Sequence, residues 1–135
     1  MPDVSLLAYI HELPTGIDLH TYMNMTVKVA AAFLFGALIG WERERHGRPA
    51  GLRTHLLVCL GATLAMIVSE FMTHKYGALG GGSALVGMRT DPARIAAQVM
   101  TGVGFIGAGV ILTIGKSIRG LTTAACLWLT AAAGL

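Results

Sequence analysis

The stretch DPARIAAQVMTGVGFIGAGVI, residues 91–111, decides the fold of this chain. Asp91 suits the N-cap of a helix, and Pro92 suits its first position, where the missing N–H costs nothing. After Arg94 the residues are uncharged over the range 95–114, and about 20 such residues cross a hydrocarbon core of roughly 30 Å. The stretch therefore predicts a membrane-spanning helix.

Composition and further apolar runs extend this prediction to the whole chain. Hydrophobic residues make up 54% of the 135 residues, charged residues only 13%, and mean hydropathy is +0.66, far from an ordinary soluble domain. We expect an all-α, polytopic transmembrane helical bundle of about four spans. The predicted spans cover residues 23–41, 52–71, 95–114 and 121–135.

The chain then divides into two parts. Residues 1–22 form an N-terminal segment that we expect outside the membrane or on its outer surface, and residues 23–135 form one transmembrane domain. The last apolar run stops after about 15 residues, short of a full crossing, so we expect an incomplete fourth span.

Basic residues gather in one predicted loop between the first two spans. Arg43, Arg45, Arg48 and Arg53 lie within eleven residues, and cytoplasmic loops of membrane proteins carry an excess of Lys and Arg. We therefore expect this loop to face the cytoplasm and the N-terminus to lie outside it. Because the other basic residues are divided among loops without interleaved aromatic residues, no nucleic-acid partner is expected.

Small residues recur at close spacing within the predicted spans. Such residues let helix backbones approach where lipid supplies no hydrophobic force between helices. The predicted packing positions are Gly36, Gly40, Gly61, Ala65, Gly102, Gly104, Gly107 and Gly109. Packing within one chain is favoured, and a homodimer remains open. The GVGFIG pattern at 102–107 is not interpreted as a dinucleotide site, because it lies inside an apolar run and not in a βαβ unit.

A polar set opens the third predicted span. Asp91, Arg94 and Gln98 are three and four residues apart, so they can share one helix face. Polar groups at membrane depth usually face protein or water, which makes these residues candidates for a buried polar network. The alternative is that Asp91 caps the helix, Arg94 extends to the membrane surface and Gln98 makes one interhelical hydrogen bond.

A mixed-charge turn follows the first predicted span. Its residues are Glu42, Arg43, Glu44, Arg45, Arg48 and Arg53. The turn is a candidate interaction site for a protein partner or for anionic lipid head groups. The alternative is a solvated loop whose arginines only set the topology. Arg53 is placed to pair with Glu42 or Glu44 across the hairpin.

Metal, cofactor and catalytic sites are not expected. The five histidines show no ligand spacing, and the acidic residues avoid the centres of the predicted spans. Asp91 and Glu70 make at best a sparse entry site for Mg²⁺, which favours carboxylates and retained waters. Cys59 and Cys126 fall inside spans and are expected to be free thiols. No nucleophile with an orienting base is recognisable, so an enzyme is not expected.

Two long arrays carry a family resemblance. GALIGWERERHGRPAGLRTHLLVCLGA at 36–62 and DPARIAAQVMTGVGFIGAGVILTIGKSIRGLTTAACLW at 91–128 resemble the MgtC/SapB family of bacterial inner-membrane proteins. The resemblance implies a helical membrane domain of four or five spans with the N-terminus outside the cytoplasm. The family motif positions map onto Glu42, Arg43, residues 51–54, Asp91, Arg94 and Gln98. The resemblance implies that longer members add a soluble C-terminal domain, and functions that reside there are not expected of residues 1–135.

The resemblance also directs the functional expectation. Members are associated with growth at low magnesium, acid stress, intracellular survival and regulation of other membrane proteins, including ATP synthase. We expect a protein that modulates other membrane proteins in magnesium limitation or acid stress, through helix association in the bilayer with specificity from the charged turn. The alternative is a transporter or channel for Mg²⁺ or protons. A water-filled path lined by Asp91, Arg94 and Gln98 would favour transport, and a dry, glycine-packed bundle would favour the regulator.

Overall fold

The computed structural model describes residues 19–77, 91, 93–114 and 117–135. Most of the predicted N-terminal segment 1–22 lies outside these residues. The described chain forms, in order, α2 (Leu19–Arg45), α3 (Leu52–Gly77), α4 (Ala93–Val110), β1 (Leu112–Ile114), β2 (Ser117–Arg119) and α5 (Leu121–Gly134).

Three of these helices are long and apolar enough to cross a membrane: α2, the Leu52–Thr73 part of α3, and α4. Helix α5 is shorter, with 14 residues. Both α2 and α3 run beyond the predicted ranges 23–41 and 52–71, because their ends continue as helix through polar residues. The prediction of an all-α, multi-pass membrane bundle is confirmed.

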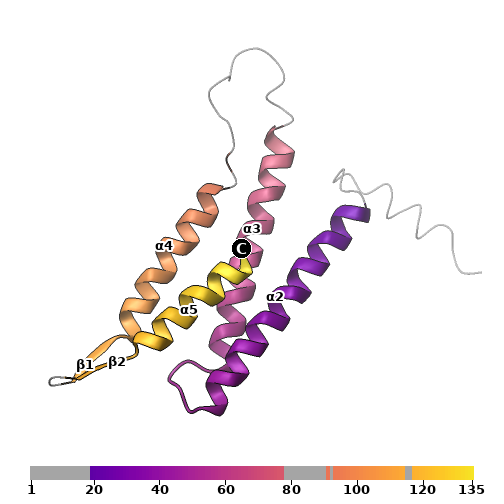
Figure 1. Cartoon of the computed structure of the whole chain (residues 1–135). Helices are drawn as coiled ribbons and strands as arrows, with labels where there is room; N and C mark the ends of the chain where they lie inside the picture. Colours follow the sequence, from indigo (N-terminus) through magenta and orange to yellow (C-terminus); the bar gives the residue numbers. More distant parts are fainter. Residues whose placement is uncertain (1–18, 78–90, 92, 115–116) are drawn as a thin grey trace, which may run out of the picture.

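The helices form a thin bundle (Figure 1). Helices α2 and α3 make a hairpin, joined by a short turn in which Gly47 adopts a positive φ of 61°. Helix α4 lies on the far side of α3 from α2. Helix α5 crosses over α3 between α4 and α2, and it contacts all three of these helices. Helix α5 is the central element, because Leu127, Thr123 and Ala131 are among its fully enclosed side chains.

Glycine contacts explain the closeness of α2 and α3. A Cβ at Gly40 would lie 2.7 Å from the Cα of Leu52, and one at Gly36 would lie 3.1 Å from the backbone oxygen of His55. Real Cβ atoms essentially never lie as close as 2.7 Å, and 3.1 Å is tighter than nine in ten real Cβ contacts. The hairpin therefore packs backbone against backbone at these two positions, as small residues permit in membrane helices.

The end of α4 corrects the predicted span 95–114. The helix stops at Val110, and Leu112 to Ile114 instead pair with Ser117 to Arg119 as an antiparallel ladder. The hydropathy of this segment equals that of a helix, but its β-branched residues favour strands. Gly120, with a φ of 90°, then opens α5 in a space where a Cβ would collide with the carbonyl oxygen of Val110.

Candidate functional sites

A buried polar cluster occupies the end of the bundle where α2 ends and α3 and α5 begin; we call this the basic end. Arg43 is only 7% exposed, and its Nη2 donates a hydrogen bond to Thr123 Oγ1 at 2.9 Å. No carboxylate of the described residues lies within ion-pair distance of its guanidinium. Its Nε is buried, and none of the described residues supplies a hydrogen-bond partner for it. Arg43 thus joins α2 to the first turn of α5 through a single hydroxyl group.

His55, in the first turn of α3, is a second buried polar side chain at the basic end. The side chain is fully buried, and its Nδ1 lies 2.9 Å from the carbonyl oxygen of Gly51. The carbonyl oxygen only accepts, so Nδ1 is the donor of this hydrogen bond. Nε2 is buried, and no hydrogen-bond partner for it is found among the described residues. Charge alone could not have identified His55, because its burial depends on the contact of Gly40 with α3.

Glu44 has a structural role in the charged turn. One of its oxygens accepts a hydrogen bond from the backbone N–H of Leu52 at 2.8 Å, at the positive end of the α3 dipole. A Cβ at Gly51 would lie 2.9 Å from the same oxygen, so glycine leaves room for this cap. Glu42 pairs with His46 at 3.1 Å. Arg53 is exposed and pairs with neither glutamate in the described structure.

An apolar groove of about 480 Å³ runs along α2 at the basic end. It is lined by Leu38, Ile39, Trp41, Glu42, Arg45 and His46. Trp41 and Leu38 are each more than 60% exposed. Arg45, Arg48 and Arg53 are also exposed nearby, and no ion pair of theirs is found among the described residues. The groove thus combines apolar walls with the Glu42–His46 pair and with Arg45, for which no ion pair is found among the described residues.

The predicted polar set lies on the outward face of α4. Asp91 Oδ1 accepts a hydrogen bond from the backbone N–H of Ala93 at 3.0 Å, which is the geometry of a helix cap. Asp91, Arg94 and Gln98 are all exposed. Their side chains make no hydrogen bonds to one another in the described part of the chain. These three residues therefore do not form a buried polar network within the described residues of a single chain.

An ion pair that sequence reasoning missed joins α2 to α3. Lys28 Nζ lies 2.6 Å from Glu70 Oε1, although the residues are 42 positions apart. The only sequence signal was a lysine and a glutamate inside two neighbouring apolar runs, and their heights match only once the hairpin register is known.

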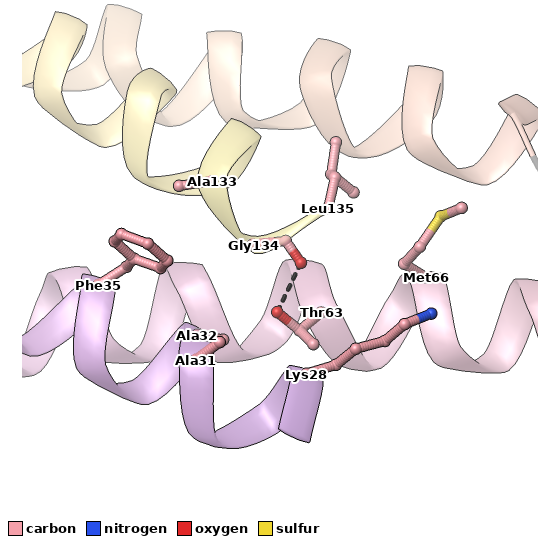
Figure 2. A pocket seen from close by; sticks show the side chains of 9 residues that line it. All are labelled: Lys28, Ala31, Ala32, Phe35, Thr63, Met66, Ala133, Gly134 and Leu135. Carbon is pink, nitrogen blue, oxygen red and sulfur yellow. Dashed lines mark hydrogen bonds between the residues drawn. The ribbon is translucent and has the colours of Figure 1, made fainter. Parts of the chain in front are cut away.

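A small pocket of about 170 Å³ lies beside Lys28. Its lining comes from α2, α3 and the last residues of the chain, and in Figure 2 Phe35 and Met66 stand at its sides. The Thr63 hydroxyl points to the carbonyl oxygen of Gly134 and donates a 2.5 Å hydrogen bond to it. The pocket is largely apolar apart from the ammonium group and this bond.

The predicted packing glycines fall into two groups. Gly36, Gly40 and Gly107 lie against neighbouring helices, Gly107 with 3.5 Å from its Cβ position to the Cβ of Ala124. A second group has nothing within 4 Å of the Cβ position: Gly61, Gly102, Gly104 and Gly109. Ala65 is partly buried. The helix surface at the second group of glycines is available for contacts with molecules other than this chain.

Among the described residues no group of three or more His, Cys, Asp or Glu could hold a metal ion. Cys59 and Cys126 are free thiols. The helices, the charged groups within them and the basic end therefore define the class: a multi-pass helical membrane protein.

The chain belongs to the MgtC family, whose model matches residues 29–135. It is 53% identical over 107 residues to "Putative magnesium transporter YhiD" of Escherichia coli K12, covering 79% of this chain and 46% of that protein. It is 44% identical over 107 residues to "Protein MgtC" of Brucella abortus strain 2308, covering 79% and 39%. For "Protein MgtC" of Salmonella typhimurium the identity is 44% over 109 residues, covering 81% and 41%.

This chain thus matches less than half the length of these relatives. One of these relatives carries the name of a putative magnesium transporter, and the other two are named Protein MgtC. No solved structure matches the chain.

Proposed function

We propose that the protein binds other membrane proteins and modulates them under magnesium limitation or acid stress. The observation that carries this proposal is the groove at the basic end, with its exposed Trp41 and with Arg45, which is exposed and has no ion pair among the described residues. A partner helix with apolar residues and a carboxylate near the membrane surface would match both features. The names of the relatives support the link to magnesium.

The aromatic side chain of the groove and the arginines near it are expected to contribute differently to the binding of a partner. Buried aromatic anchors dominate binding energy, and Trp is enriched among them. Charges at a rim change the association rate and partner choice more than affinity, and exposed pairs contribute about 0.2–1 kcal/mol each. Trp41 is therefore the affinity anchor, and Arg45 and Arg48 select the partner.

The same arginines support a proposal for location and orientation. We propose that the protein lies in the bacterial inner membrane, with the basic end in the cytoplasm and the N-terminus outside it. The hairpin carries Arg43, Arg45, Arg48 and Arg53 within one short connection, which is the distribution that retains a loop in the cytoplasm.

Photo-crosslinking tests the groove directly. With benzoylphenylalanine at Trp41, we expect a discrete heteromeric adduct in bacterial membranes, because a partner lies within reach of this position. Phe33, which is exposed on α2 but does not line the groove, is the matched control. Arg45→Gln combined with Arg48→Gln should reduce the adduct at Trp41.

The outcome that would contradict this proposal is equal labelling at the two positions, unchanged by the arginine substitutions. Labelling of the loop with a membrane-impermeant reagent confirms that the orientation is unaltered in each variant. This control is required because arginines also direct topology.

Transport of Mg²⁺ or protons is the second candidate function. The ion pair of Lys28 and Glu70 favours it, since ionisable residues within membrane helices commonly mark ion or proton paths. The name of one relative agrees with it. Against Mg²⁺, Glu70 is engaged by an ammonium group, whereas Mg²⁺ sites use carboxylates that can face the ion and its waters.

A further inference from the structure

The outward face of α4 has a second, longer pattern. Six exposed residues, five of them in α4 and Asp91 just before it, follow the alternating three- and four-residue spacing of a coiled-coil seam: Asp91, Arg94, Gln98, Thr101, Phe105 and Ala108. The buried residues of this helix, Val103 and Gly107, lie on its other side. On a helix with 100° per residue, Arg94 and Phe105 point almost opposite to Val103. One side of α4 therefore packs in the bundle and the other presents a complete seam.

Arg94 and Gln98 are the seam residues whose side chains have no partner among the described residues, whereas Asp91 caps the helix and Thr101 bonds to the carbonyl oxygen of Ala97. No hydrogen bond from the side chains of Arg94 or Gln98 is found in the described structure, and both are exposed. Gln98 lies about 8 Å along the helix from its first residue, where a polar amide facing lipid is costly. Such residues normally face protein or water, so this seam requires a polar neighbour.

We propose that α4 pairs with α4 of a second copy, as a parallel two-stranded coiled coil about a two-fold axis along the membrane normal. A two-fold contact requires a surface that complements itself. Gln98 does so, because an amide both donates and accepts and can pair with Gln98 of the second copy. Asp91 and Arg94 have opposite charges one helical turn apart, so each meets its counterpart reciprocally.

The remaining seam residues fit close approach of two helices. Phe105 is 84% exposed and occupies the same seam position as Gln98, seven residues further on. Gly102 and Gly109 flank the seam with open space at their Cβ positions, which permits close backbone contact. A polar residue at one core position also fixes register and oligomeric state. Gln98 is the residue in that position.

The dimer and the groove use different sides of the bundle. Helices α3 and α5 lie between α4 and α2 (Figure 1), so pairing through α4 leaves Trp41 accessible. The proposed dimer therefore does not depend on the proposed function, and an experiment can reject either proposal without rejecting the other.

Cysteine crosslinking of purified protein in proteoliposomes tests the contact. In a Cys126→Ala background, Gln98→Cys and Phe105→Cys should form disulfide-linked dimers about fivefold more than Phe33→Cys, because a disulfide needs Cα atoms roughly 4.4–6.8 Å apart. The parent, which retains buried Cys59, gives the baseline. Yields no higher than that of Phe33→Cys would overturn the proposal. Crosslinks to another protein in cell membranes, absent from the purified protein, would also overturn it.

Substitutions that do not add a crosslink provide a second test. Gln98→Leu should lower the dimer fraction at a fixed protein-to-lipid ratio by about three- to tenfold, while Gln98→Asn retains most of it. Asp91→Arg and Arg94→Asp should each weaken the dimer, and the double exchange should restore it, because the reciprocal pairs are re-formed. An unchanged dimer fraction in Gln98→Leu, or no recovery in the double exchange, would contradict the proposed pairing.

Discussion

Alanine in place of Gly40 is expected to lower the free energy of unfolding by about 1–3 kcal/mol, the range for overpacking a close contact. The new Cβ would lie 2.7 Å from Leu52 Cα and 3.0 Å from Leu52 O. Both are backbone atoms, so relief requires that α2 and α3 move apart. The movement would also disturb His55, whose Cβ is 3.1 Å from the same position. Unfolding by SDS in mixed micelles measures the change.

Gly61→Ala is the matched control for this prediction. Gly61 lies in the middle of α3 with nothing within 4 Å of its Cβ position, and alanine favours helix over glycine by about 1 kcal/mol in water. We expect an unchanged or higher stability. If Gly40→Ala were as stable as Gly61→Ala, the backbone contact between α2 and α3 would not exist as described.

Thr123→Val is expected to cost about 1–3 kcal/mol, because it leaves a buried donor of Arg43 without its acceptor. Valine has nearly the shape of threonine, so the loss is electrostatic and not a cavity. Arg43 already has a buried Nε without a partner and no carboxylate within ion-pair distance in the described structure. The stabilisation of the buried Arg43 charge therefore depends mainly on the hydroxyl group of Thr123. Mixed-micelle unfolding reports the loss.

Two further variants isolate the interaction between Arg43 and Thr123. Thr122→Val changes an exposed neighbour and should stay within about 0.5 kcal/mol of the parent. Arg43→Met combined with Thr123→Val should be less destabilised than the sum of the single variants, since removing both partners leaves no orphaned charge. Additive losses would show that the hydrogen bond does not couple α2 to α5.

The helical fold could be predicted because apolar run length alone determines it in a membrane. The same signal failed at the end of α4, where Leu112 to Ile114 are as apolar as the helix before them but form a strand. Hydropathy does not distinguish the two structures, whereas the β-branched residues and the positive φ at Gly120 do. Backbone preference decides such a boundary.

The candidate sites were predictable in part. The charged turn and the polar start of α4 could be located, because charge is visible in a sequence. The different roles of the arginines in the turn could not be predicted, since Arg43 turns inward to Thr123 while Arg45 stays exposed. The pairing of Lys28 with Glu70 likewise depends on the register of the hairpin. Tertiary packing, and not residue type, determines these roles.

We propose that the protein acts by association with other membrane proteins and not by conduction. Mg²⁺ and proton flux into sealed proteoliposomes tests this claim most directly, with protein-free liposomes as the baseline and circular dichroism to confirm folded protein. We predict flux equal to the baseline for the parent and for the Glu70→Gln, Asp91→Ala and Arg94→Ala variants. Flux above the baseline that is lost in Glu70→Gln would contradict the account and would make the Lys28–Glu70 pair part of a transport path.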